Sequence, residues 1–234
     1  MLLSQKISNL FRRLGLMPLA NYLINIRYFV SNILPASLGG NHYKRIYNDT
    51  FYNNRNQDEV LGSTPTLIAN YIIKTFHPAS IIDFGCGTGI YLQAFADKGV
   101  EILGIDASSS ALNNFRPDKS KIIIKDITQP VNLGKKFSGA ICFEVAEHIP
   151  KKFSKNLIEN ICRASDLIIF SAAPKGQGGI GHINEQRPEF WIELFNQAGL
   201  KYLKAETNEL KDYLKNNQAI FWLTNNILIF SKQK

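Results

Sequence analysis

Three side chains that could carry out chemistry follow the apolar run at residues 139–143: Glu144, Glu147 and His148, in the stretch "FEVAEHIP". Charged groups at the end of a buried strand need solvent, a partner or a function. A positioned imidazole or carboxylate can remove a proton from a reacting group, and the same groups can bind a metal ion. We therefore predict a functional site here. The structural alternative is a carboxylate that caps a helix beginning near Pro150, with His148 bridging loop backbone.

A second polar stretch, residues 171–191, is the longest glycine-rich part of the chain. It follows the fifth predicted strand, where loops often carry specificity. The stretch supplies a hydrogen-bonding set suited to a polyhydroxylated substrate such as a sugar: Lys175, Gln177, His182, Asn184, Glu185 and Gln186. The alternative is a mobile surface loop. His182 could also complete a mixed oxygen and nitrogen ligand set for Mg²⁺ or Mn²⁺ with the residues after strand four.

Glycines at positions 85, 87 and 89 lie between an apolar strand and a helix, in "IIDFGCGTGIY". They allow a tight turn and a close approach of the backbone to a ligand, which indicates a nucleotide-like cofactor. Asp106 ends the second strand about 20 residues further on, where a carboxylate can accept hydrogen bonds from ribose hydroxyls. The structural alternatives are a turn without a ligand and a helix N-cap at Asp106.

Two details separate this turn from a dinucleotide-binding one. The third glycine of G-x-G-x-x-G is one position early, at Gly89, so Ile90 occupies its place. Asp83 would face a pyrophosphate unfavourably, but it would suit a ligand that carries an ammonium and a sulfonium group. An NAD-dependent oxidoreductase is therefore the least favoured class of enzyme.

Short β-branched runs alternate with helical patterns along the centre of the chain. We predict helices at 64–76 and 187–200, and strands at 81–84, 102–105, 122–124, 140–143 and 167–170. Continuously apolar strands that alternate with helices indicate a parallel sheet covered on both faces. Two further strands are expected in "KYLKAET" (201–207) and "IFWLTNNILIF" (220–230), without a full-length helix between them. Three aromatic residues are expected to pack in the core: Phe190, Trp191 and Trp222.

Composition favours an ordinary globular protein in a reducing compartment. The chain has 234 residues, of which 45% are hydrophobic, and its three cysteines are an odd number without metal-type spacing. No run approaches the roughly 18 apolar residues of a membrane-spanning helix. Lys6, Arg12 and Arg13 would interrupt the core of a signal peptide. We expect a cytoplasmic protein.

Residues 1–45 are predicted to form a helical appendage, with helical apolar spacing at 2–17 and 19–34, before a domain at 46–234. The net charge is +8, and the basic residues of this appendage precede the first acidic residue: Lys6, Arg12, Arg13, Arg27, Lys44 and Arg45. We expect these helices to close over the predicted cofactor-binding cleft. Peripheral contact with the inner face of a membrane through a basic amphipathic helix is the alternative. Three aromatic residues could cover a bound cofactor: Tyr47, Phe51 and Tyr52.

Four segments resemble, in order and spacing, the cofactor-binding motifs of class I S-adenosylmethionine-dependent methyltransferases: "IIDFGCGTGIYLQAF", "EILGIDAS", "IIIKDIT" and "SGAICFEVAEHI". The resemblance is close over residues 80–150 and extends loosely to the end of the last predicted strand. It implies an α/β, Rossmann-like fold with a seven-stranded, mostly parallel sheet, helices on both faces and an antiparallel last strand. It also implies S-adenosylmethionine as the cofactor.

The resemblance further implies which residues contact the cofactor. Asp83 and the glycine turn would hold its methionine end, and Asp106 its ribose. Asp126 and the backbone at Ile127 would lie near the adenine. The implied cofactor-binding set is Asp83, Gly85, Cys86, Gly87, Gly89, Asp106, Ala107, Asp126, Ile127 and Phe143.

The catalytic set is expected to consist of His148, Glu144, Glu147 and His182, with His148 as the base. Glu-x-x-Glu-His followed by a later His also resembles the metal-binding constellation of small-RNA terminal 2′-O-methyltransferases. In part it resembles that of the ubiquinone-pathway O-methyltransferases. We expect proton transfer rather than a metal, and we keep a divalent Mg²⁺ or Mn²⁺ ion as the alternative.

We expect methyl transfer to an oxygen, less favourably a nitrogen, of a small-molecule or glycan-type acceptor. "FRRLGLMPLA", "EVAEHI" and "GGIGHINEQ" resemble a branch of methyltransferases associated with bacterial surface-polysaccharide pathways. The alternatives are an RNA methyltransferase, which the charge would suit, and a cofactor-binding scaffold without catalysis. We do not expect nucleic acid as a partner, because no RNA-binding module is recognisable. The oligomeric state cannot be inferred from these patterns.

Overall fold

The computed structural model describes residues 61–179 and 181–232. Its strands are β1 (Ser80–Phe84), β2 (Glu101–Asp106), β3 (Ile122–Ile124), β4 (Gly139–Phe143), β5 (Leu167–Ser171), β6 (Lys201–Tyr202) and β7 (Leu228–Ser231). Its α-helices are α6 (Thr64–Phe76), α7 (Ile90–Ala96), α8 (Ser109–Asn114), α9 (Ser154–Ala164), α10 (Pro188–Gln197), α11 (Lys204–Asn216) and α12 (Phe221–Asn226). Short 3₁₀ turns are η2 (Lys119–Lys121), η3 (Ala146–His148) and η4 (Lys151–Phe153).

The predictions for the N-terminal appendage and for the three covering aromatics concern residues outside the described part of the chain. Among the described helices, none combines the length and the apolar character that crossing a membrane requires. The predicted membrane contact and the predicted domain boundary at residue 46 therefore stay predictions.

The seven strands form one sheet in the order β3-β2-β1-β4-β5-β7-β6. β1 pairs in parallel with β2 on one side and with β4 on the other, and β5 continues the parallel part beside β4. β7 runs antiparallel to both β5 and β6. The predicted fold class is confirmed, and the five predicted parallel strands agree with the observed ones to within one residue at either end.

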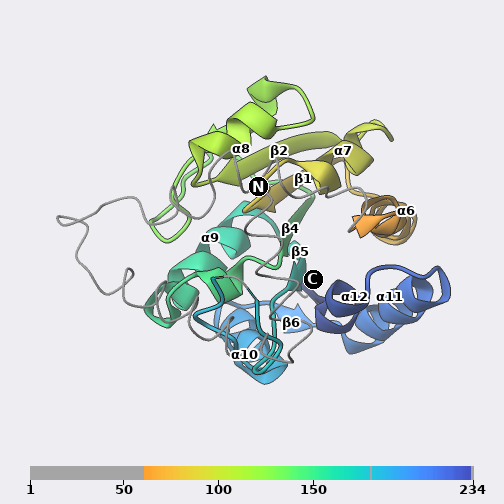
Figure 1. Cartoon of the computed structure of the whole chain (residues 1–234), viewed down its shortest axis with the longest axis vertical. Helices are drawn as coiled ribbons and strands as arrows, with labels where there is room; N and C mark the ends of the chain where they lie inside the picture. Colours follow the sequence, from red (N-terminus) through yellow and green to blue (C-terminus); the bar gives the residue numbers. More distant parts are fainter. Residues whose placement is uncertain (1–60, 180, 233–234) are drawn as a thin grey trace, which may run out of the picture.

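Helices cover both faces of this sheet, with α6 and α11 on one side and α9 and α10 on the other (Figure 1). Neighbouring residues of a strand point to opposite faces. In β1, Ile81 packs in the buried cluster with α6 and α11, whereas Ile82 packs in the cluster with α9 and α10. The same division holds for Ile141 and Cys142 of β4. Burial on both faces explains why the central strands are continuously apolar.

The C-terminal part of the chain differs from its prediction. The first of the two expected strands is only β6, and the 13-residue helix α11 follows it. Thr207, Leu210 and Leu214 form the buried face of α11 at spacings of three and four residues, which is the helical period. In the second expected strand, only the end becomes β7, because its first half is helix α12. The expectation that no full-length helix separates the two strands was wrong.

Candidate active site

A cavity of about 640 Å³ lies at the carboxyl ends of β1, β2 and β4, a volume typical of small-molecule sites. It is lined by all the predicted catalytic residues and by every predicted cofactor-binding residue except Gly89. Parallel pairing brings these residues together, since it places the carboxyl ends of neighbouring strands at one edge of the sheet. The residues selected from the sequence therefore lie around one cavity, and their roles stay predictions.

The glycine turn after β1 has the backbone geometry that glycine permits. Gly85 has φ +80°, and a Cβ there would lie 2.5 Å from the side chain of Val145. Gly89 has φ +71° and is the N-cap residue of α7, and a Cβ there would collide with the ring of Phe115. Gly89 therefore shapes the turn from behind, although it does not line the cavity. The N–H groups of Gly85 and Cys86 both donate to the carbonyl of Ile105, which joins the turn to β2.

Asp106 connects the glycine turn after β1 to the segment that follows β2. One carboxylate oxygen accepts a hydrogen bond from the N–H of Gly87 at 2.9 Å, and the other accepts one from the N–H of Ser108 at 2.8 Å. Ser108, and not Asp106, caps α8, through a 3.2 Å bond from the N–H of Ser110. The N-cap alternative for Asp106 was therefore wrong. A carboxylate has about four acceptor positions, so these two bonds leave capacity for ribose hydroxyls.

Asp83 is a buried carboxylate in the floor of the cavity, with 3% of its surface exposed. Burial, and then the charge of Asp106, raise the pKa of Asp83 well above its ordinary value. Burial also raises the pKa of Asp106, although hydrogen bonds from backbone N–H groups partly offset the increase. Two acidic groups that repel each other favour a ligand that brings positive charge.

The loop after β3 forms a third side of the cavity. One oxygen of Asp126 accepts hydrogen bonds from the N–H of Thr128 at 2.8 Å and from its hydroxyl at 2.7 Å. Asn160 of α9 holds this loop from behind: its amide donates to the carbonyls of Ile127 and Gln129, both at 2.8 Å. Asn160 was not identified from the sequence, because a buried amide inside a helix carries no local signature.

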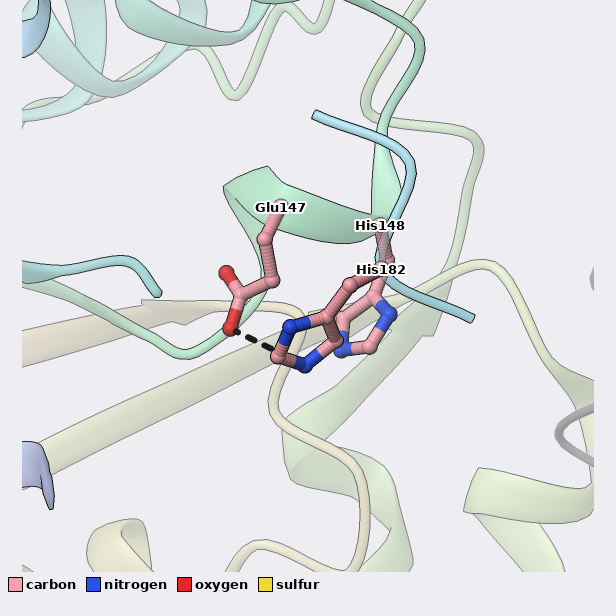
Figure 2. A group of neighbouring side chains, drawn as sticks. All are labelled: Glu147, His148 and His182. Carbon is pink, nitrogen blue, oxygen red and sulfur yellow. Dashed lines mark ion pairs between the residues drawn. The ribbon is translucent and has the colours of Figure 1, made fainter. Parts of the chain in front are cut away.

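The 3₁₀ turn η3, which Glu144 and Val145 connect to β4, brings Glu147 and His148 beside His182 (Figure 2). One potential ligand atom from each of the three residues lies within 4.8 Å of the others. Nε2 of His182 is 4.0 Å from Oε1 of Glu147, and the two imidazole rings are 4.9 Å apart in an edge-on arrangement. The carbonyl of Glu147 accepts hydrogen bonds from the N–H groups of Ile183 and Asn184, which fixes the loop after β5 against η3.

Glu147 is the most unusual group of this cluster. It is fully buried, and neither carboxylate oxygen has a hydrogen-bond partner within normal distance and angle. Burial, followed by the charge of Glu144, raises the pKa of Glu147 well above its ordinary value. The backbone N–H groups of Glu147 and Ala173, although outside normal hydrogen-bond geometry, lower this pKa only in part. A buried carboxylate in such a position is costly in free energy unless a proton or a cation joins it.

Glu144 does not belong to the three-residue cluster. Its backbone has φ 53°, a left-handed conformation that is uncommon for a residue other than glycine and is found preferentially at functional sites. Its carboxylate instead accepts a 3.2 Å hydrogen bond from the amide of Asn226 and a longer one, 3.4 Å, from Gln177. The four predicted catalytic residues therefore line one cavity but form two groups.

The loop after β5 uses most of its polar side chains for its own structure. Glu185 accepts hydrogen bonds from the N–H groups of Gly176 and Gly178 and from Nδ1 of His182. Asn184 is 2% exposed and donates to the hydroxyl of Ser154. Within the predicted sugar-binding set, only Gln177 and His182 line the cavity. The prediction that the whole set faces a substrate was wrong for the others.

The structural alternative for residues 144–150 had two parts, a carboxylate that caps a helix near Pro150 and a contact of His148 with loop backbone, and only the second is observed. No side chain caps η4 or α9, so the predicted carboxylate cap is absent from these two described elements. His148 does bridge loop backbone, since its Nδ1 lies 3.1 Å from the carbonyl of Gly181. A carbonyl only accepts, so Nδ1 carries the proton and Nε2 carries the lone pair when the ring is neutral.

The predictions that Trp191 and Trp222 pack in the core had different outcomes. Trp191 is 1% exposed and packs against Phe170 in the core, as expected. Trp222 is 40% exposed and lines the cavity, so the prediction that it packs in the core was wrong. In a strand, Trp222 and Thr224 would have shared one face, but the helical turn of α12 buries Leu223 and directs Trp222 to the cavity.

Over residues 54–171 the chain matches the methyltransferase-domain family, which is just over half of its length. The chain therefore belongs to this family, and its predicted membership of the S-adenosylmethionine-dependent methyltransferases is confirmed.

Two relatives and one solved structure illustrate the similarity. The chain is 23% identical over 151 residues to a ubiquinone biosynthesis O-methyltransferase from Leptothrix cholodnii, and 27% identical over 154 residues to a magnesium-protoporphyrin O-methyltransferase from Synechocystis. Each match covers 61% of this chain and, respectively, 60% and 66% of the relative. A crystal structure of the Synechocystis magnesium protoporphyrin IX methyltransferase superposes with a TM-score of 0.56 at 16% identity, over 82% of this chain and 93% of that one.

The raised pKa of Glu147 predicts a pH-dependent change in stability for Glu147→Gln. A carboxyl that holds its proton more tightly when folded makes the folded state less stable as the pH rises above about 4.3, the unfolded pKa. The uncharged amide does not titrate. We therefore expect the variant to have a higher Tm than the wild type at pH 8 in EDTA, by roughly 2–4 °C for each kcal/mol relieved, and the difference to shrink toward pH 5.

Thermal unfolding measured across this pH range tests the prediction. Glu193→Gln is the matched control, because Glu193 is exposed on α10 and its replacement should leave the Tm unchanged at every pH. A Glu147→Gln variant that is less stable than the wild type at pH 8 would contradict the assignment of an uncompensated carboxylate.

Proposed function

We propose that the protein transfers the methyl group of S-adenosylmethionine to an oxygen of a small-molecule or glycan-type acceptor. One observation carries the proposal: the glycine turn, Asp106 and the cluster of Glu147, His148 and His182 line a single cavity in a methyltransferase-domain fold. The relatives named above are O-methyltransferases with small-molecule acceptors in their names, which supports oxygen as the methylated atom.

The cofactor would lie across the carboxyl ends of β1 and β2. Its ammonium and sulfonium groups suit the repelling carboxyl groups of Asp83 and Asp106, because positive charge would lower both raised pKa values. The ribose hydroxyls would donate to the remaining acceptor positions of Asp106. The adenine would lie toward Asp126 and Ile127, with Phe143 against the cofactor.

When bound, S-adenosylmethionine would supply its methyl group to the acceptor oxygen, and S-adenosylhomocysteine would be the second product. The protein mainly orients the two reactants. The acceptor hydroxyl gives up its proton, and Nε2 of His148 would accept it, because the carbonyl of Gly181 keeps the proton of the neutral ring on Nδ1.

Replacing His148 separates chemistry from cofactor binding. We expect His148→Ala to lower the rate of S-adenosylhomocysteine formation, measured with a panel of phenols and glycosides as acceptors, by about 10²- to 10⁴-fold, the usual contribution of a general base. The affinity for S-adenosylhomocysteine should change little. The control is His77→Asn, because His77 is an exposed residue with φ 50° that asparagine tolerates. A rate within twofold of the wild type for His148→Ala would contradict the role of base.

A second role for the same cluster is supported by the unpartnered carboxylate of Glu147. Glu147, His148 and His182 fit a divalent cation, since they offer one carboxylate and two imidazoles at short mutual distances. When bound, such an ion would act as a Lewis acid on the acceptor hydroxyl. Glu185, hydrogen-bonded to Nδ1 of His182, would orient that ring toward the ion.

The cation is tested by binding and not by turnover. If the cluster holds a metal, Mn²⁺ titrated into the metal-free protein should lose its free-ion electron paramagnetic resonance signal at one ion per chain. Glu147→Gln and His182→Ala should abolish that binding, and the control Glu193→Gln should preserve it. Wild-type protein that leaves the free Mn²⁺ signal unchanged would contradict the metal role and leave proton transfer as the function of the cluster.

A further inference from the structure

We infer that the part of the cavity between α12 and the loop after β5 is a subsite for a pyranose ring of the acceptor, with Trp222 as its stacking platform. The inference rests on the proposed function and names its substrate class. It is carried by the position of α12, whose cavity-facing side chains were not expected from the sequence.

One face of α12 carries both parts of this subsite. Trp222 and Asn226 are four residues apart, so their side chains lie one above the other on the same face of the helix. Asn226 donates at 2.9 Å to the amide oxygen of Gln177 and at 3.2 Å to the carboxylate of Glu144, and both of these partners line the cavity. The indole of Trp222, which lines the same cavity, is thus about one helical turn from this polar group.

Trp222 is placed to bind rather than to fold. Leu223, its neighbour, is 1% exposed and anchors α12 in the core, whereas Trp222 leaves 40% of its surface accessible. The face of an indole is the negative side of its quadrupole, and it favours contact with weakly positive C–H groups. One face of a pyranose ring presents such C–H groups while its hydroxyls project at the edge.

The polar group beside Trp222 suits several hydroxyls rather than one. Glu144 supplies acceptors only, and Gln177 and Asn226 each supply two donors and one acceptor. These three side chains hydrogen-bond one another, and adjacent hydroxyls, which both donate and accept, can take the place of those partners. A phenolic acceptor has an apolar ring edge and would offer these groups far fewer hydrogen bonds than a pyranose.

The subsite also lies where the reaction needs its acceptor. Glu144 is the first residue after β4, and His148 is one short turn further along the chain, in the same cavity. Gln177 and His182 of the loop after β5 contact Glu144 and His148, respectively, in this cavity. A ring that rests on Trp222 and binds Glu144 would therefore have another of its hydroxyls on the side of His148.

Saturation-transfer NMR tests the subsite directly. The probes are the methyl pyranosides of glucose, galactose, mannose and rhamnose, together with catechol, added to full-length protein with S-adenosylhomocysteine. Trp222→Ala is the test variant. Phe221→Ala is its matched control, because Phe221 is the neighbouring aromatic residue, is 77% exposed and does not line the cavity. We expect pyranoside signals in wild type and in Phe221→Ala, a loss of at least fivefold in Trp222→Ala, and S-adenosylhomocysteine signals in all three.

The outcomes separate the two levels of the proposal. Pyranoside signals that persist in Trp222→Ala, signals from catechol alone, or no acceptor signal while S-adenosylhomocysteine binds would each overturn the pyranose subsite and leave the proposed function standing. Absence of S-adenosylhomocysteine binding in the wild type would overturn the proposed function, and the subsite with it.

Discussion

Parallel pairing of β1 with β2 and with β4 is the constraint on which the site depends. Register alignment of these strands places the glycine turn, Asp106 and Glu144 at one edge, and the backbone of β2 holds the turn through the carbonyl of Ile105. The two buried clusters on the faces of the sheet keep that edge in place. The residues that carry chemistry then need only short connections to reach one cavity, although they run from Asp83 to His182 along the chain.

The edge of the sheet concentrates buried carboxyl groups around one cavity. Asp83 and Glu147 are both buried, and the pKa of each is raised well above its ordinary value, mainly by burial. Such groups lower the stability of the free protein, and they are retained at sites where a ligand relieves the cost. A cationic cofactor at Asp83, and a proton or a metal ion at Glu147, would supply that relief at two points of one cavity.

The sequence predicted what local patterns determine. Apolar runs identified β1 to β5, because strands buried on both faces are continuously apolar. Glycine spacing identified the turn at Gly85, because a positive φ favours glycine. Helix α11 was missed because its buried face is only Thr207, Leu210 and Leu214 among charged residues. The contact between Glu147 and His182, 35 positions apart, depends on how the loop after β5 folds back, and that folding also uses Glu185 internally. The exposure of Trp222 depends on α12 replacing an expected strand.

Calorimetric titration of the purified protein measures whether this edge of the sheet binds an adenosyl cofactor. We expect saturable binding of S-adenosylmethionine and S-adenosylhomocysteine, no binding of NAD, and a loss of at least tenfold in affinity for both adenosyl ligands in Asp106→Asn, about 1.4 kcal/mol. Binding of NAD in their place, or adenosyl binding that is unchanged in Asp106→Asn, would contradict this expectation.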